Sequence, residues 1–173
     1  MPTAAWSTSS PGTLAPWFRL DLNGTLLGSA AVHAVDCAAS GGRLYLLADR
    51  RLYVFDRNLR ELAMVELEGH AAVLPRIPPG VRSRVMALRG DRLYVVLHSR
   101  EGPLLEVRDA GTLRLLDAYR LPSGDECAFW GLAEGSDVVA YGVCLDRAGS
   151  RYLKVVWPAG NRTDVLRLNV PLH

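Results

Sequence analysis

The chain has 173 residues, of which 49% are hydrophobic and 22% charged, and its formal net charge is +2. This balance is ordinary for a globular protein, and the small net charge does not indicate nucleic acid or an acidic membrane as the partner. A chain of this length corresponds to one domain or two small ones and needs neither a disulfide nor a metal to fold. No apolar run approaches the ~18 residues of a membrane-spanning helix, so we expect no membrane span.

The N-terminal segment, residues 1–16, is rich in Ser, Thr, Ala and Pro and has no hydrophobic periodicity. We expect it to be a flexible arm, with Trp6 as its one anchor on the body or on a partner. The segment lacks the basic and apolar regions of a secretory signal. We therefore expect a cytoplasmic protein.

The next segment, residues 17–32, predicts a β-hairpin. Phe18, Leu20 and Leu22 alternate with polar residues, and Asn23-Gly24 is a strong signal for a tight turn between two strands. We interpret this segment as half of a repeat unit.

Residues 33–70 predict a complete unit of four strands. Aromatic and branched apolar residues dominate it, as a half-buried pleated sheet requires. Short turns separate the expected strands, which are 34–38, 43–48, 52–55 and 62–67.

A break follows at residues 71–82, where three prolines fall within five residues. Proline removes a backbone donor, so this composition excludes a helix and a central strand. We predict a long loop that presents a candidate contact surface at Pro75, Pro78, Pro79 and Gly80.

Two further units follow the loop, at residues 83–121 and 127–170. In the first of them we expect strands at 84–88, 93–98, 104–107 and 113–121. In the second we expect strands at 128–133, 138–145, 152–157 and 165–170. Residues 17–173 together would then form a single β-repeat domain.

Self-similarity between the units indicates the architecture. Arg43-Leu44-Tyr45 recurs as Arg92-Leu93-Tyr94, and Asp137-Val138-Val139 takes the same place in the third unit. The turn between the third and fourth strands also recurs, at Leu20-Asp21, Phe55-Asp56 and Arg108-Asp109. Four strands per unit at a period of about 40–50 residues is typical of β-propeller blades.

The pattern Gly-x-x-Leu-Tyr-Val followed by Val-x-Asp and Leu resembles the broad class of propellers with quinoprotein-like and YVTN-type repeats. The resemblance covers residues 17–170 and implies an all-β fold of four-stranded antiparallel units. The tryptophan ladder of quinoprotein enzymes and the Trp-Asp ending of WD40 blades are absent, so no functional residue carries over. A β-sandwich or barrel of similar strand count is the alternative.

The number of units is short of a closed ring. A half unit and three full ones make about three and a half blades, whereas a propeller usually has at least four. Three explanations remain open: two strands are unrecognised, the sheets close as a barrel or sandwich, or a second chain covers the open end. An uncovered terminal blade would expose an apolar face, which is a contact site or an aggregation hazard.

No motif in the sequence indicates a catalytic, metal or cofactor site. The four histidines lie far apart in sequence, and the three cysteines lack C-x-x-C spacing, so we predict neither a metal nor a cofactor. Cys127 and Cys144 are expected on neighbouring strands. A bridge between them is one interpretation, and buried thiols without a bridge are the favoured one.

The one suggestive cluster is basic. Only Asp91 and Glu101 stand as acids between or beside its members, so the run could grip phosphates or an acidic partner. The alternative is a charged edge strand that prevents aggregation. The cluster consists of Arg76, Arg82, Arg84, Arg89, Arg92 and Arg100.

From these patterns we expect a non-catalytic, propeller-like interaction subunit or scaffold, with a protein partner or a second copy at the open blade edge. The first alternative is a ligand- or glycan-binding or hydrolytic propeller with acidic turn residues at one mouth: Asp49, Asp91, Asp125 and Glu126. A nucleic-acid-associated factor using the arginine run is the weaker alternative.

Overall fold

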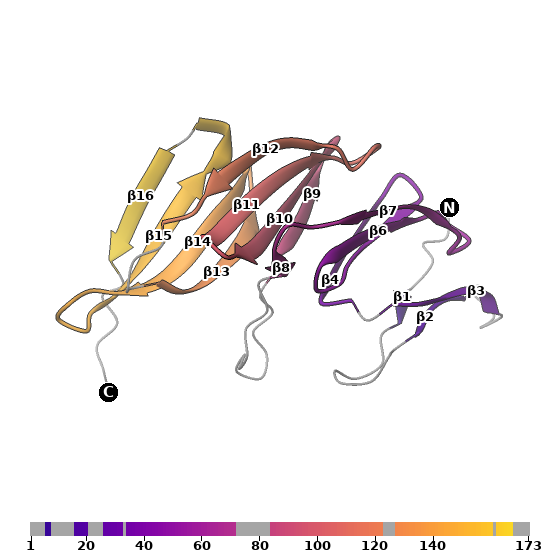
Figure 1. Ribbon diagram of the computed structural model, residues 1–173, viewed down its shortest axis with the longest axis horizontal. Helices are drawn as coiled ribbons and strands as arrows, with labels where there is room; N and C mark the ends of the chain where they lie inside the picture. The colour runs from indigo at the N-terminus through magenta and orange to yellow at the C-terminus, as the bar shows by residue number, and fades with distance from the viewer. Residues whose placement is uncertain are drawn as a thin grey trace. The chain divides into compact units, whose positions relative to one another are not determined.

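The computed structural model describes residues 6–7, 16–20, 26–32, 34–71, 84–122, 127–160 and 162–167 (Figure 1). In these residues every regular element is a β-strand, apart from one 3-10 turn. The chain divides into two compact units, Met1–Leu67 and Glu68–His173. The all-β prediction is confirmed, and each unit is described below by itself.

The first sheet of unit 1, sheet A, has the strand order β1-β2-β3. Strands β2 (Pro16–Leu20) and β3 (Leu26–Ala31) form the predicted hairpin. Strand β1 (Trp6–Ser7) pairs with β2 and lies in the segment that we expected to be a loose arm. A strand of two residues has too little alternation to be recognised in a sequence.

Sheet B, the second sheet of unit 1, is a meander of four antiparallel strands in chain order. Leu44, Leu46, Phe55 and Leu59 form its buried cluster. Gly41 and Gly42 both have positive φ, which explains why two glycines join the first two strands. The strands are β4 (Asp36–Ser40), β5 (Arg43–Leu47), β6 (Arg51–Phe55) and β7 (Glu61–Glu66).

The recurring Asp turn noted in the sequence has a structural role. In sheet B, Asp56 Oδ1 accepts hydrogen bonds from the backbone amides of Asn58 and Arg60, at 2.7 and 2.9 Å. Leu59 follows in a left-handed conformation (φ 59°) and is only 6% exposed. A leucine rarely adopts such a φ, so burial of its side chain must offset the backbone cost.

A related turn recurs in unit 2, with one more residue between the aspartate and the leucine. Asp109 Oδ1 accepts hydrogen bonds from the amides of Gly111 and Thr112 and from the Thr112 hydroxyl. These bonds, led by the one from the hydroxyl, lower the pKa of Asp109 below its ordinary value of 3.8. Leu113 is left-handed (φ 60°) and buried, as Leu59 is. The Asp-to-Leu recurrence in the sequence is therefore a turn motif.

Sheet C opens unit 2, and its first strand is interrupted. Strands β8 (His70–Ala71) and β9 (Met86–Arg89) both pair with the same edge of β10 (Arg92–Ser99). The predicted proline loop falls between them, outside the described residues. Strands β11 (Gly102–Asp109) and β12 (Leu115–Arg120) complete the sheet.

Sheet D is the second four-stranded meander and contains β13 (Cys127–Glu134), β14 (Val138–Leu145), β15 (Arg151–Trp157) and β16 (Arg162–Arg167). The 3-10 turn η1 (Pro158–Gly160) lies between its last two strands. Sheet D is joined to sheet C within unit 2: the Leu132 amide donates to the Arg84 carbonyl at 2.7 Å, and Arg84 pairs with Glu134 at 3.1 Å.

The central strands of the sheets contribute most of the buried core residues. In β5 and β10, successive residues are buried whichever side of the sheet they face, whereas β7 and β12 are mostly exposed. Sheets B, C and D correspond to the three full units expected from the sequence. Sheet A takes the place of the expected half unit but has three strands rather than two, because β1 adds to the hairpin.

Candidate interaction face

One face of sheet D is apolar and only partly covered. In β14, Val138, Ala140 and Cys144 point to one side and are buried. Val139, Tyr141 and Val143 point to the other side and are half-buried, and Leu145 at the end of the strand is 47% exposed. Burial alternates along β14 although the side chains on both sides are apolar, which is typical of a sheet that packs against other structure on both faces.

The neighbouring strands extend this face. Register places Leu153 of β15 opposite Val143, and Leu166 of β16, which is 52% exposed, opposite Leu153. Burial raises the pKa of the Tyr141 hydroxyl. We call this surface the outer face of sheet D, defined by Val139, Tyr141, Val143, Leu145, Leu153 and Leu166.

Charged side chains border the outer face of sheet D. The Arg162 guanidinium lies over the Trp157 ring, 4.5 Å from its centroid, and its Nε donates to Asp164 Oδ2 at 2.9 Å. Arg162 and Trp157 are direct cross-strand partners. An apolar centre with a polar rim is the anatomy of protein–protein interfaces.

The predicted arginine run divides into separate places. Arg84 pairs with Glu134, and the Arg89 guanidinium donates to the Gly135 carbonyl, so both contact sheet D. Arg92 lies opposite Arg89 across the β9–β10 hairpin. Arg100 follows the far end of β10, roughly 25 Å from Arg92 at strand rise.

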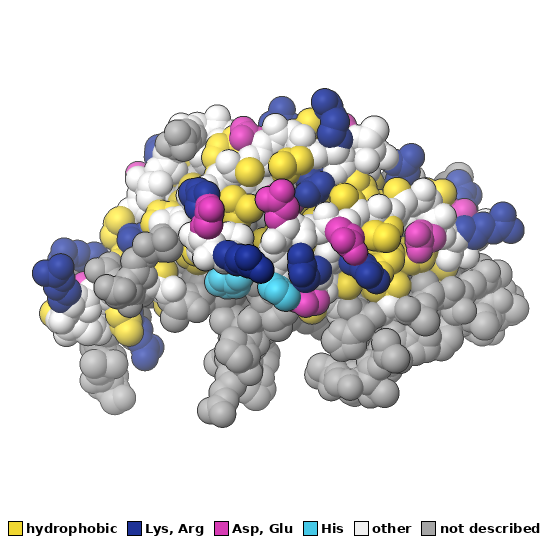
Figure 2. Space-filling model, in the orientation of Figure 1, with side chains coloured by type: hydrophobic (Ala, Val, Ile, Leu, Met, Phe, Trp, Pro, Cys, Tyr) yellow, Lys and Arg dark blue, Asp and Glu magenta, His cyan; other side chains and the backbone are white. Residues whose placement is uncertain are grey.

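Basic and acidic side chains lie interspersed on the face shown in Figure 2.

The structure places Arg84 and Arg89 against sheet D and Arg100 at the other end of β10. Arg76 and Arg82 lie outside the described residues, as do the four loop residues Pro75, Pro78, Pro79 and Gly80. Trp6 is in β1, where it pairs with Arg19.

Two histidines that are distant in sequence meet in sheet C. His70 of β8 is the direct cross-strand partner of His98 of β10, and both are exposed. Figure 2 shows histidine side chains gathered at one place on the face that it draws. Sequence reasoning missed this pair because β8 was not recognised as a strand, and only the register of β8 on β10 reveals it.

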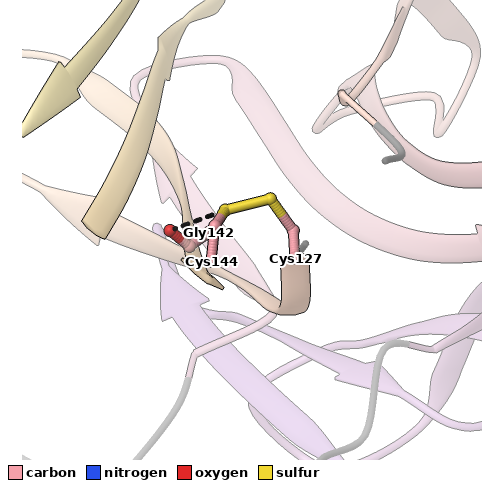
Figure 3. Close-up of a disulfide and its surroundings, with 3 residues drawn as sticks. All are labelled: Cys127, Gly142 and Cys144. Carbon is pink, nitrogen blue, oxygen red and sulfur yellow. Dashed lines mark hydrogen bonds between the residues drawn. A yellow bond between two sulfur atoms is a disulfide. The ribbon is translucent and has the colours of Figure 1, made fainter. Parts of the chain in front are cut away.

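The inner face of sheet D is locked by a disulfide between Cys127 and Cys144, whose Cα atoms are 3.9 Å apart (Figure 3). The favoured expectation of unbridged thiols at these two positions is therefore wrong. Both cysteines were placed on neighbouring strands, but the sequence pattern did not reveal that they occupy directly opposed positions.

Trp130 fills the same inner face and is 1% exposed. It is the cross-strand partner of Gly142, where an added Cβ would lie 2.9 Å from the ring. The Trp130 indole nitrogen has no hydrogen-bond acceptor among the described residues. Gly142 is thus the space into which the tryptophan ring fits.

Sheet C buries an ion pair that the sequence did not reveal. Arg108 Nε donates to Glu106 Oε2 at 2.7 Å, and its Nη1 donates to the Leu113 carbonyl at 2.9 Å. Glu106 is 1% exposed and Arg108 6%. Because Arg108 anchors the turn that holds Leu113, we interpret the pair as structural.

The acidic turn residues give no metal cluster in the described part of the chain. Asp146 accepts hydrogen bonds from the amides of Ala148 and Ser150, and Asp125 and Glu126 fall outside the described residues. Across the described ranges, no group of three or more His, Cys, Asp or Glu residues is arranged to hold a metal ion. Nor does any helix in those ranges have the length and apolarity to cross a membrane.

No protein-family model matches the chain, and neither does any curated protein sequence. Solved structures do match its fold. BamB from Moraxella catarrhalis matches with a TM-score of 0.55 and 13% identity over 95% of this chain. Dihydro-heme d1 dehydrogenase NirN matches with a TM-score of 0.59 and 16% identity over 97% of this chain. The Pan2 WD40 domain from Neurospora crassa matches with a TM-score of 0.53 and 8% identity over 93% of this chain.

The fold is that of a β-propeller. Sheets A to D correspond to propeller blades, in agreement with the resemblance noted in the sequence. The chain spans 52% of the BamB chain, 36% of the NirN chain and 50% of the Pan2 domain chain, which is about half or less of the length of each. At these identities the likeness concerns the fold alone.

Proposed function

We propose that this propeller chain is a non-catalytic interaction subunit and that the outer face of sheet D is its contact surface. The observation that carries the proposal is a run of six partly exposed apolar side chains across three adjacent strands. Contiguous apolar surface of this kind marks interaction sites in soluble proteins.

Other exposed apolar residues do not form such a surface. In sheet B, Leu62 and Met64 lie on the single outer strand β7. In sheet C, Leu115 and Leu116 are adjacent on β12 and so point to opposite faces. Met64 does lie opposite the half-buried Tyr53 of β6, but the next residue across the sheet, Leu46, is buried. Among the described side chains, sheet D is where partly exposed apolar residues continue across three strands.

The energetic gain from covering this face is substantial. Leu145 and Leu166 are about half exposed. Completing their burial would contribute roughly 1 kcal/mol each, because full burial of a leucine contributes about 1.5–3 kcal/mol. The half-buried members of the face add to this gain, while the charged rim at Arg162 and Asp164 would orient the partner.

The fitting partner presents a complementary apolar sheet. In a propeller each blade covers the face of its neighbour, so a sheet with an apolar outer face such as that of sheet D is suited to contact a second sheet. A second copy of this chain or a different protein with a similar sheet would serve. Trp6, the proline loop and the arginine run remain sequence-based candidates for further contacts.

Native mass tests the proposal. We expect the wild-type particle to exceed the 18.9 kDa of one chain, either at about twice that mass or with a stoichiometric partner. The double variant Leu145→Glu/Leu166→Glu should lose the association, because two carboxylates replace apolar contact area and must give up their hydration when the face is covered. Arg151 lies opposite position 145 and can pair with at most one of them. Light scattering coupled to size exclusion measures both.

The matched control is Leu62→Glu/Met64→Glu on sheet B. These two apolar side chains are 53% and 45% exposed, which is close to the exposure of Leu145 and Leu166. This variant should keep the wild-type mass. A wild-type particle of 18.9 kDa without a stoichiometric partner would refute the proposal, as would equal loss of association in both double variants.

A further inference from the structure

His70 and His98 form a cross-strand pair at the exposed end of sheet C. They are directly opposed in the antiparallel register, so their side chains project on the same face of the sheet. Their sequence neighbours Ala71 and Leu97 are also opposed, and both are buried. Alternation therefore places the two imidazoles together on the opposite side, where both residues are exposed.

Close backbone contact fixes this register. A Cβ at Gly69 would lie 2.7 Å from the His98 carbonyl oxygen and 3.1 Å from the Leu97 Cβ. Only glycine fits at this approach, and it brings the chain against β10 one residue before His70. The spacing of the two imidazoles is thus set by packed backbone.

Directly opposed residues in antiparallel strands have Cβ atoms about 4.5–5.5 Å apart. Two imidazoles rooted at that distance can converge on one ion, since zinc–nitrogen bonds are about 2.0–2.1 Å long. Imidazole nitrogen suits late divalent transition ions such as Zn²⁺, Ni²⁺ and Cu²⁺. Magnesium and calcium require oxygen ligands, which this pair lacks.

We propose that His70 and His98 form a two-histidine site for a late divalent transition ion. The ion bridges β8 to β10 and so fastens the short first piece of the interrupted strand. Two protein ligands leave coordination positions for water or for a group from a bound partner. The site is in sheet C and does not depend on the function proposed for the outer face of sheet D.

Calorimetric titration with zinc chloride or nickel chloride alone tests the site. The wild type should bind one ion, and His70→Gln and His98→Gln should each weaken binding at least about tenfold, because each turns a chelate into a single ligand. Both positions are exposed, so both variants should fold as the wild type does. The control His33→Gln/His173→Gln removes the other two histidines of the chain and should keep wild-type affinity.

Thermal unfolding supplies a second readout. Zinc should raise the melting temperature of the wild type and of the control, because the ion binds only when β8 is paired with β10. It should not raise that of His70→Gln or His98→Gln. Wild-type affinity in His98→Gln, or loss of binding in the control, would show that the metal binds elsewhere and would overturn the proposal.

Discussion

At the residue scale, Trp130 packs so closely against Gly142 that a Cβ there would lie 2.9 Å from the indole ring. We predict that Gly142→Ala destabilises the protein by about 1–3 kcal/mol, since the new methyl group would overlap the indole ring and force it to move. Urea unfolding measures the loss.

Gly135→Ala is the matched control for this change. The nearest atom to a Cβ there is the Asp137 carbonyl oxygen at 3.9 Å, an ordinary contact, so this variant should be close to wild type. An equal loss in both variants would contradict the packing argument and would indicate a general backbone effect of replacing glycine.

Single residues were predictable where they govern local conformation. The Asp turns at Asp56 and Asp109 were recognisable because their hydrogen bonds are local. Glu106 and Arg108 were not predictable as buried, because alternating charged residues in a strand usually indicate a solvent-facing side. Their burial depends on each other and on the Leu113 carbonyl, which only the folded structure brings together.

At the element scale, the disulfide joins the first two strands of sheet D across a sequence separation of 17. We predict that reduction lowers stability by about 2–4 kcal/mol, because closing a loop of this size restricts the unfolded chain. The measurement is denaturant unfolding with and without a phosphine reductant.

The Cys127→Ala/Cys144→Ala variant is the control for reduction. It should unfold at the same denaturant concentration in both conditions and should match the reduced wild type. A wild-type midpoint that does not change with reductant would contradict a stabilising bridge.

Strand positions in the full units were predictable to within a few residues, as 43–48 and β5 illustrate. The repeat pattern and the turns supplied this information, because both are local properties of a meander. Strand β8 was not predictable, since two residues paired across an interruption carry no period. The His70–His98 pair was missed for the same reason.

At the scale of the whole molecule, the two units suggest independent folding. We predict that a fragment of residues 68–173 unfolds cooperatively, because sheets C and D are joined by the Arg84–Leu132 backbone bond and the Arg84–Glu134 ion pair. Circular dichroism during urea unfolding tests this. A fragment of residues 84–173, which lacks β8, should be less stable, and absence of a cooperative transition in the longer fragment would contradict the prediction.

The propeller fold was predictable from the repeat, whereas the contact surface was not. The sequence pattern indicated an open blade edge, but which side chains stay exposed depends on what each sheet packs against. In the sequence, nothing distinguishes Val139, Tyr141 and Val143 from ordinary core residues. In the structure they are only partly buried, whereas Ala140 and Cys144 on the other side of β14 are buried, and this difference defines the outer face of sheet D.

The interrupted first strand of sheet C has a consequence for folding and for sequence variation. Every other strand pair in the described sheets joins neighbours along the chain, so these pairs close short loops and form rapidly. The pairing of β8 with β10 instead closes across the segment between Ala71 and Arg84. Closure entropy grows slowly with length, at about 0.6 kcal/mol for each doubling. That segment can therefore change greatly in length and composition while the sheet around it keeps its register.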